Sequence, residues 1–110
     1  MQLKEFELQI KKDIPLSESL AFEFQRFENG VLEVKAPYLP NKNDKQTVFA
    51  GSQASLALLS GWSLVNLLFE SKSVKSVAAV KTEMHYRKPI EKDFLARARL
   101  SDESDIQHIE

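Results

Sequence analysis

The feature that most constrains the fold of this chain is a run of twenty residues, 50–69, that contains no charged side chain (AGSQASLALLSGWSLVNLLF). A helix of about 20 apolar residues could cross a bilayer. On a helical wheel, however, the polar residues of the run fall on one arc, and the opposite arc is wholly apolar. We therefore expect a helix that protein encloses on nearly all sides, and not a membrane span. The polar arc contains Ser52, Gln53, Ser55, Ser60, Ser63 and Asn66, interleaved with Leu56, Leu59 and Leu67, and the apolar arc contains Ala54, Ala57, Leu58, Gly61, Leu64, Val65, Leu68 and Phe69.

Length and charge narrow the class of protein further. A chain of 110 residues with 43% hydrophobic and 28% charged residues has material for one domain with a single core. Fifteen Lys and Arg against sixteen Asp and Glu give a net charge of −1, which disfavours nucleic acid and acidic membranes as partners. The absence of cysteine excludes disulfides, thiolate metal sites and cysteine nucleophiles. The N-terminal stretch MQLKEFELQIKKD does not look like a secretory signal, so we expect a cytoplasmic protein.

Strand patterns flank the uncharged run on both sides. Before it, LAFEFQRF and VLEVKA surround Asn29-Gly30, and Asn-Gly between alternating runs is the strongest short-range hairpin signal. After it, SVAAVKTEMHYR alternates as far as Pro89, and residues 93–100 alternate again. The residues expected to face inward on these strands are Leu20, Phe22, Phe24, Leu32, Val34, Ala36, Ala78, Val80, Thr82, Met84, Tyr86, Phe94, Ala96, Ala98 and Leu100.

The order of these elements predicts an α+β domain over residues 1–110. An antiparallel sheet with one solvated face, wrapped round one long central helix, accommodates every element. Leu3, Phe6 and Ile10 lie at helical spacing, so residues 1–13 are expected to form an amphipathic helix that ends by Pro15. Residues 101–110 form an acidic tail.

Several motifs, taken in this order, resemble the thioesterase family of hotdog-fold proteins, in particular the domain that follows an acetyltransferase domain in some bacterial proteins. The resemblance covers roughly residues 14–98. It is carried by IPLSESLAF, then the hairpin, then APYLPNKNDKQTVFAGS, then SLALLSGW, and finally HYRKPI. Its most specific parts are Asn41-x-Asn43, residues 47–52, Gly61-Trp62 and Tyr86-x-x-Pro89.

The resemblance implies a hotdog fold, a long helix wrapped by an antiparallel sheet, usually paired into homodimers with substrate sites at the subunit interface. It implies hydrolysis of acyl thioesters of coenzyme A or acyl carrier protein, without a cofactor. Two or so further strands usually follow the point at which this sequence stops, so we expect a shortened sheet with an open edge.

The start of the helix offers a site for this chemistry. Attack on a thioester carbonyl places negative charge on its oxygen, and preorganised amides aimed at that oxygen lower the barrier by several kcal/mol. The N–H groups at Gly51 and Ser52, together with the positive end of the helix, could supply this stabilisation. Alternatively, Gly51 and Ser52 simply begin and cap a helix.

The attacking water needs a partner as well. Asn43 occupies the position that looks equivalent to an Asn of related hotdog thioesterases, but Phe49 stands where their His would be and Leu58 near their helical acid. Asp44 could serve as base, or it is an exposed loop acid. Thr47 could donate a hydrogen bond to substrate, or it satisfies the loop backbone.

Substrate contacts are expected from Phe49 and from the strand after the helix. Thr82, Met84 and Tyr86, in a row with Val80, could line an acyl slot, or they are plain core. Arg87 and Lys88 could meet the phosphates of coenzyme A or a phosphopantetheine arm, or they form a solvated edge. His85 falls on the outward face of the strand, and nothing surrounds His108 in the tail, so neither is expected to be catalytic.

Other chemistries find no support in the sequence. No pair of His, Asp or Glu has the spacing of metal ligands on one element, and no Gly-rich phosphate loop is present. A hotdog dehydratase is disfavoured because no His precedes the helix. The main alternative to a thioesterase is a non-catalytic acyl-binding or dimerisation module, which the missing helical acid favours.

Overall fold

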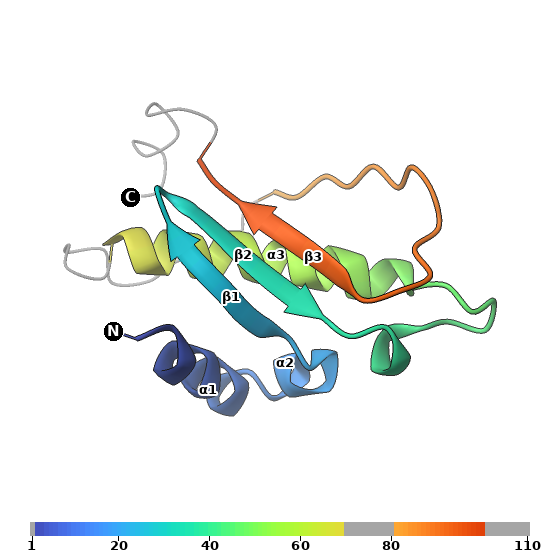
Figure 1. Cartoon of the computed structure of the whole chain (residues 1–110), viewed down its shortest axis with the longest axis horizontal. Helices are drawn as coiled ribbons and strands as arrows, with labels where there is room; N and C mark the ends of the chain where they lie inside the picture. The colour runs from blue at the N-terminus through green and yellow to red at the C-terminus, as the bar shows by residue number, and fades with distance from the viewer. Residues whose placement is uncertain (1, 70–80, 101–110) are drawn as a thin grey trace.

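The chain folds into a three-stranded antiparallel sheet with one long helix packed across it and two short helices along one edge (Figure 1). We describe a computed structural model in which residues 2–69 and 81–100 are placed. The strand order is β1-β2-β3. The elements are α1 (Leu3–Asp13), α2 (Pro15–Leu20), β1 (Glu23–Glu28), β2 (Val31–Ala36), the 3-10 helix η1 (Leu39–Asn41), α3 (Ala50–Phe69) and β3 (Phe94–Ala98).

The hairpin between β1 and β2 forms at the predicted turn. Asn29 and Gly30 both have positive φ, 52° and 74°, as a tight turn between twisted strands requires. Glu28 pairs with Val31 directly across this turn. The register then shifts between Phe24 and Arg26, so the strict alternation expected for β1 breaks at a bulge.

The inner face of the sheet carries the core. Leu32, Val34 and Ala36 of β2 are fully buried, and they pair in register with Ala98, Ala96 and Phe94 of β3. The predicted inward rows of these two strands are therefore confirmed as far as Ala98, and Leu100 lies beyond the end of β3. Leu20, predicted to belong to the first strand, instead ends α2, because Pro15 begins a second helix and Ala21 closes it in the left-handed conformation.

The long helix α3 packs on the sheet through its serine-containing arc. Its buried residues are Leu56, Leu59, Ser60, Ser63, Leu64 and Leu67. Small hydroxyls fit beneath the strands between the leucines, and the Ser60 hydroxyl donates to the Leu56 carbonyl at 2.6 Å. The apolar arc, apart from Leu64, lies partly or fully exposed. By length and composition alone, α3 could also cross a membrane.

This arrangement corrects one expectation. The described residues cover α3 mainly on one side and do not enclose it on nearly all sides as predicted, since its contacts with the sheet come mainly from β2 and β3. The outward arc, with Leu58 46% exposed, has no covering element among residues 2–69 and 81–100.

Helix α1 is held against β1 by one buried carboxylate. Glu7 of α1 is 1% exposed, and its Oε1 accepts the backbone N–H of Phe24 at 2.9 Å. Lys4 and Lys11 donate to its other oxygen at 2.9 and 3.4 Å. Because Phe6 also stacks on Phe24, α1 closes the outer edge of β1.

The strand predicted just after α3 is wrong over its described part. Residues 81–93 contain no strand, and Thr82, Met84 and Tyr86 are exposed instead of facing a core. Alternation buries one face only where a neighbouring strand accepts the pairing, and β3 pairs with β2 alone among the described strands. Ala78 and Val80 lie outside the described residues.

Candidate functional site

The loop that leads into α3 is a closed turn organised by Asn43. Its side-chain oxygen accepts the N–H groups of Lys45 and Thr47 at 2.8 and 3.1 Å. Its side-chain nitrogen donates to the Thr47 hydroxyl at 2.9 Å. The polar atoms of the Asn43 amide are therefore engaged within the loop, and Gln46 adopts a positive φ of 63° to close it.

The start of α3 leaves two amides without acceptors. The Phe49 carbonyl accepts the N–H groups of Ser52 and Gln53 at 3.0 and 3.2 Å. Among the described residues, no acceptor faces the N–H groups of Ala50 and Gly51. The unpaired donors and the positive end of the helix dipole therefore lie at Ala50 and Gly51, one residue earlier than the predicted pair of Gly51 and Ser52.

The ring of Phe49 lies directly over Gly51. A Cβ at Gly51 would overlap the edge of the Phe49 ring, so the ring would have to move. Glycine therefore permits this close approach, and it is not required here by an unusual φ. Phe49 itself remains 55% exposed, so its ring forms a wall at the helix start and not part of the core.

Two cavities meet at this point. The apolar groove runs between α2, η1 and α3 and has a volume of about 560 Å³. The polar cavity lies beside the loop and has a volume of about 510 Å³. The groove is lined by Ile14, Leu16, Ser17, Ser19, Leu20, Pro40, Asn41, Phe49, Gly51, Ser52, Ser55, Leu58, Leu59 and Trp62. The polar cavity is lined by Pro40, Asn41, Lys42, Asn43, Asp44, Phe49, Ala50 and Ser52.

The structure brings most of the predicted helix-start residues together here. Asn43, Asp44 and Ser52 line the polar cavity, and Gly51 and Ser52 line the groove. Phe49 lines both. Asp44 is exposed, and Thr47 contacts Asn43 without lining either cavity.

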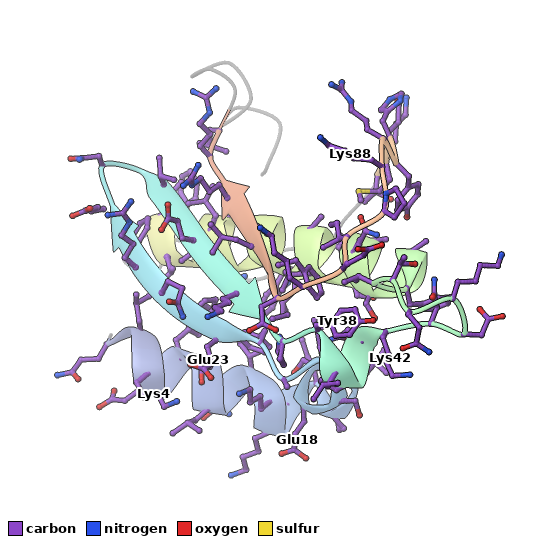
Figure 2. All side chains as sticks on the ribbon, turned by 45° about the vertical axis from the view of Figure 1, so that its right-hand side comes forward. Lys4, Glu18, Glu23, Tyr38, Lys42 and Lys88 are labelled. Carbon is purple, nitrogen blue, oxygen red and sulfur yellow. The ribbon has the colours of Figure 1, made fainter. Side chains whose placement is uncertain are left out.

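The residues predicted from the later strand do not gather at this site. Thr82, Arg87 and Lys88 are exposed, and Met84 lines a separate cavity of about 300 Å³ between α3 and β3. Tyr86 is the exception, because its hydroxyl donates to the Ala50 carbonyl at 3.2 Å. In Figure 2, Lys88 and Glu18 lie on opposite sides of α3.

The described residues hold no candidate metal centre. No group of three His, Cys, Asp or Glu side chains converges anywhere in residues 2–69 and 81–100. His85 is exposed and meets only Glu83, at 2.9 Å, while His108 lies outside the described residues.

Two features of the site were missed by sequence reasoning. The first is the contribution of α2, whose Leu16 and Leu20 line the groove. The second is Asn41, which is 4% exposed and lines both cavities. Pro15 followed by LSESL was the available signal for α2, since proline is favoured in the first turn of a helix.

Comparison with known proteins identifies the family and the fold. The family described as "Putative thioesterase (yiiD_Cterm)" matches residues 3–110, and the chain belongs to that family. The fold matches a solved structure from Shewanella oneidensis titled as a putative thioesterase, with 28% identity and a TM-score of 0.84 over 90% of this chain and 74% of that one. The fold is therefore the hotdog fold of thioesterases, as predicted.

Two further solved structures share the fold. A protein of unknown function from Chlorobaculum tepidum TLS is 25% identical, with a TM-score of 0.79 over 96% of this chain. The chain spans 65% of the length of that relative. A thioesterase from Haemophilus influenzae is 18% identical, with a TM-score of 0.80 over 93% of this chain and 70% of that one, and it supports the fold alone.

Proposed function

We propose that this protein hydrolyses acyl thioesters of coenzyme A or of acyl carrier protein at the N-terminus of α3. The observation that carries the proposal is the meeting of an apolar groove and a polar cavity at the unpaired amides of Ala50 and Gly51. An acyl thioester has the same division, an apolar chain joined to a polar reacting group. Four residues line both cavities: Pro40, Asn41, Phe49 and Ser52.

In the proposed reaction, the thioester carbonyl lies at the helix start. Water attacks the carbonyl carbon, and the oxyanion is stabilised by the N–H groups of Ala50 and Gly51 and by the helix dipole. The Ser52 hydroxyl, which lines both cavities, is a third possible donor. The C–S bond then breaks, and the products are a carboxylic acid and a thiol.

Asp44 is the proposed proton acceptor. Its side chain lines the polar cavity, and bound substrate would shield it from bulk water. Asn43 and Thr47 act in this proposal by closing the turn that carries Asp44. The attacking water gives its proton to Asp44, and the proton passes to the departing thiolate.

The acyl chain is proposed to occupy the apolar groove, with Phe49 as its wall near the reacting carbonyl. Leu16 and Leu58, 77% and 46% exposed, line this groove and would be covered by the chain. Arg87 and Lys88 stay proposed contacts for phosphate. They follow Tyr86, whose hydroxyl touches the start of α3, so an extended carrier arm could reach them.

We also propose a homodimer in which a second copy covers the outward arc of α3. The arc is uncharged, and Ala54, Ala57 and Gly61 allow another backbone to approach closely. Light scattering is expected to give about twice the 12.6 kDa of one chain. A monomer at all concentrations would contradict the dimer.

A non-catalytic acyl-binding or dimerisation module is the second candidate. It is favoured by the absence of any acidic residue in α3 and by the exposure of Asp44. Such a module would use the same groove, bind acyl-CoA and release no thiol.

Thiol release from acyl-CoA substrates of increasing chain length tests the proposal. We expect turnover that improves with chain length until the groove is filled. Leu16→Glu should raise KM for long chains about tenfold, since a charge would meet the chain in the groove. Leu8→Glu is the matched control, because Leu8 is also exposed on an N-terminal helix but lines neither cavity. Binding of acyl-CoA without thiol release would replace the enzyme by the binding module.

A further inference from the structure

Asn41 is held in one orientation by the backbone around it. Its side-chain nitrogen donates to the carbonyls of Leu20 and Pro37, at 2.9 and 2.8 Å. Only the NH₂ group can donate to two carbonyls, so these bonds also decide which end of the amide is the oxygen. Asn41 is 4% exposed, and its own carbonyl accepts the N–H of Phe49 just before α3.

The side-chain oxygen of Asn41 is left as an unused acceptor. No N–H or O–H group of the described residues donates to it. Asn41 lines both the apolar groove and the polar cavity, so it stands where the two meet. This oxygen is not closed off from solvent, since among the described residues only the Ser63 hydroxyl is both fully buried and without a partner, so a water or a ligand can supply its hydrogen bond.

Asn43, two residues later, is the opposite case. Its amide oxygen already accepts two backbone N–H groups, and its nitrogen already donates to Thr47. Of the two asparagines in the loop, Asn41 is therefore the one with hydrogen-bonding capacity to spare.

We infer that the side-chain oxygen of Asn41 holds the attacking water, an inference that rests on the proposed hydrolysis at α3. The thioester group itself has no hydrogen to donate, whereas water has two. One O–H would donate to Asn41 and the other to Asp44, which lines the same polar cavity. An oxygen lone pair is then directed at the carbonyl carbon. Asn41 stays neutral throughout, and the proton leaves to Asp44.

Competition between water and hydroxylamine tests this role. Hydroxylamine is a stronger nucleophile than water and depends less on being held, so it should still attack the thioester when Asn41 is removed. In Asn41→Ala we expect acid formation to fall about 100-fold, as for a misplaced reactant, with KM nearly unchanged. The ratio of hydroxamate to acid should rise at least about tenfold.

The uncatalysed reaction of hydroxylamine with the thioester is measured without protein and subtracted. The corrected product ratio then reports only on folded protein, so partial unfolding of the variant does not change it. Asn41→Ser, which keeps one hydroxyl donor for the Leu20 or Pro37 carbonyl, covers the case in which alanine leaves too little folded protein. Asn66→Ala is the matched control, because Asn66 lines neither cavity and bonds only to the Trp62 carbonyl among the described residues, and it should leave the ratio unchanged. An unchanged ratio in both Asn41 variants, or equal loss of both products, would overturn the role of Asn41 alone. Absence of thiol release by the wild-type chain would instead remove the proposed function and this inference with it.

Discussion

The two flanks of α3 differ in how they are held. The N-terminal flank, made of α1, α2 and η1, is fastened by buried hydrogen bonds at Glu7 and Asn41 and carries the apolar groove. The opposite flank, residues 81–93, has no regular structure and is exposed apart from Ile90. Ile90 and Asp93 accept hydrogen bonds from the backbone N–H groups of Val48 and Tyr38, and Tyr86 touches the start of α3. Substrate contacts were predicted from residues 82–88 on the opposite flank, and none from the N-terminal flank. The comparison indicates that a groove forms where buried hydrogen bonds fix its walls. Alternation of apolar and polar residues in the sequence is not enough to form one.

Acidification should produce the largest change in stability, because it protonates two hydrogen-bonded carboxylates together, those of Glu7 and Glu33. Burial favours a raised pKa for the Glu7 carboxyl, but Lys4, the Phe24 N–H and Lys11 outweigh it and lower that pKa. Hydrogen bonds from Arg26 and Arg97 lower the pKa of the Glu33 carboxyl on the outer face of the sheet.

Both carboxylates therefore contribute stability that is complete above their unfolded pKa, near 4.5, and is lost as pH falls through the lower folded values. The denaturant midpoint should fall steadily as the pH is lowered below about 4.5. A wild-type denaturant midpoint that does not change between pH 5 and pH 2 would contradict the stabilising role of the two carboxylates.

Loss of the Glu7 hydrogen bonds alone should weaken the attachment of α1 to β1 and destabilise the protein. Glu7→Ala leaves the Phe24 N–H unpaired and removes the partner of two lysines. We expect the free energy of unfolding to fall by about 2 kcal/mol. Urea denaturation measures it, and Glu5→Ala is the control on the exposed side of the same helix. Equal losses of unfolding free energy in the two variants would show that Glu7 does not hold α1 against β1.

Crowding at Gly51 should affect the site itself. Gly51→Ala places a methyl group against the Phe49 ring, and such overpacking costs about 1–2 kcal/mol when the ring cannot move fully away. Turnover should fall, and Phe49→Ala in the same chain should restore part of the stability. Gly61→Ala is the control, because nothing lies within 4 Å of its new Cβ. A Gly51→Ala variant as stable and active as wild type would contradict the contact.

A substitution in residues 81–93 should have the smallest effect on turnover and KM. Tyr86→Phe removes one hydrogen bond, from an exposed side chain, to the Ala50 carbonyl. We expect a change in KM of about twofold. A loss of tenfold or more in thiol-release assays would place residues 81–93 at the centre of the site.

Local signals made much of the fold predictable. Asn29-Gly30 specifies its turn within two residues, and the charge-free run specifies α3 by its own composition. The strand predicted through Met84 failed because a strand also needs a neighbour, which no local pattern reveals.

The residues predicted for the site lie close together, but their roles stay predictions, and their hydrogen bonding could not be foreseen from the sequence. Asn43, Asp44, Gly51 and Ser52 line the cavities at the helix start. The hydrogen bonding of Asn41 depends on the carbonyls of Leu20 and Pro37, which accept from its side-chain nitrogen. Leu20 lies far from the loop in sequence, so no local pattern reveals this contact. The groove depends on α2 packing beside α3, which is likewise a matter of tertiary structure.

Photolabelling of the acyl site tests the central claim most directly. The probe is a non-hydrolysable thioether analogue of a long-chain acyl-CoA with a diazirine at the end of its chain, bound to the wild-type protein, irradiated and mapped by mass spectrometry. The account predicts labels on residues 14–20 and 55–62, the two walls of the apolar groove. Labelling confined to residues 81–93 would contradict it and move the acyl chain to the other flank of α3.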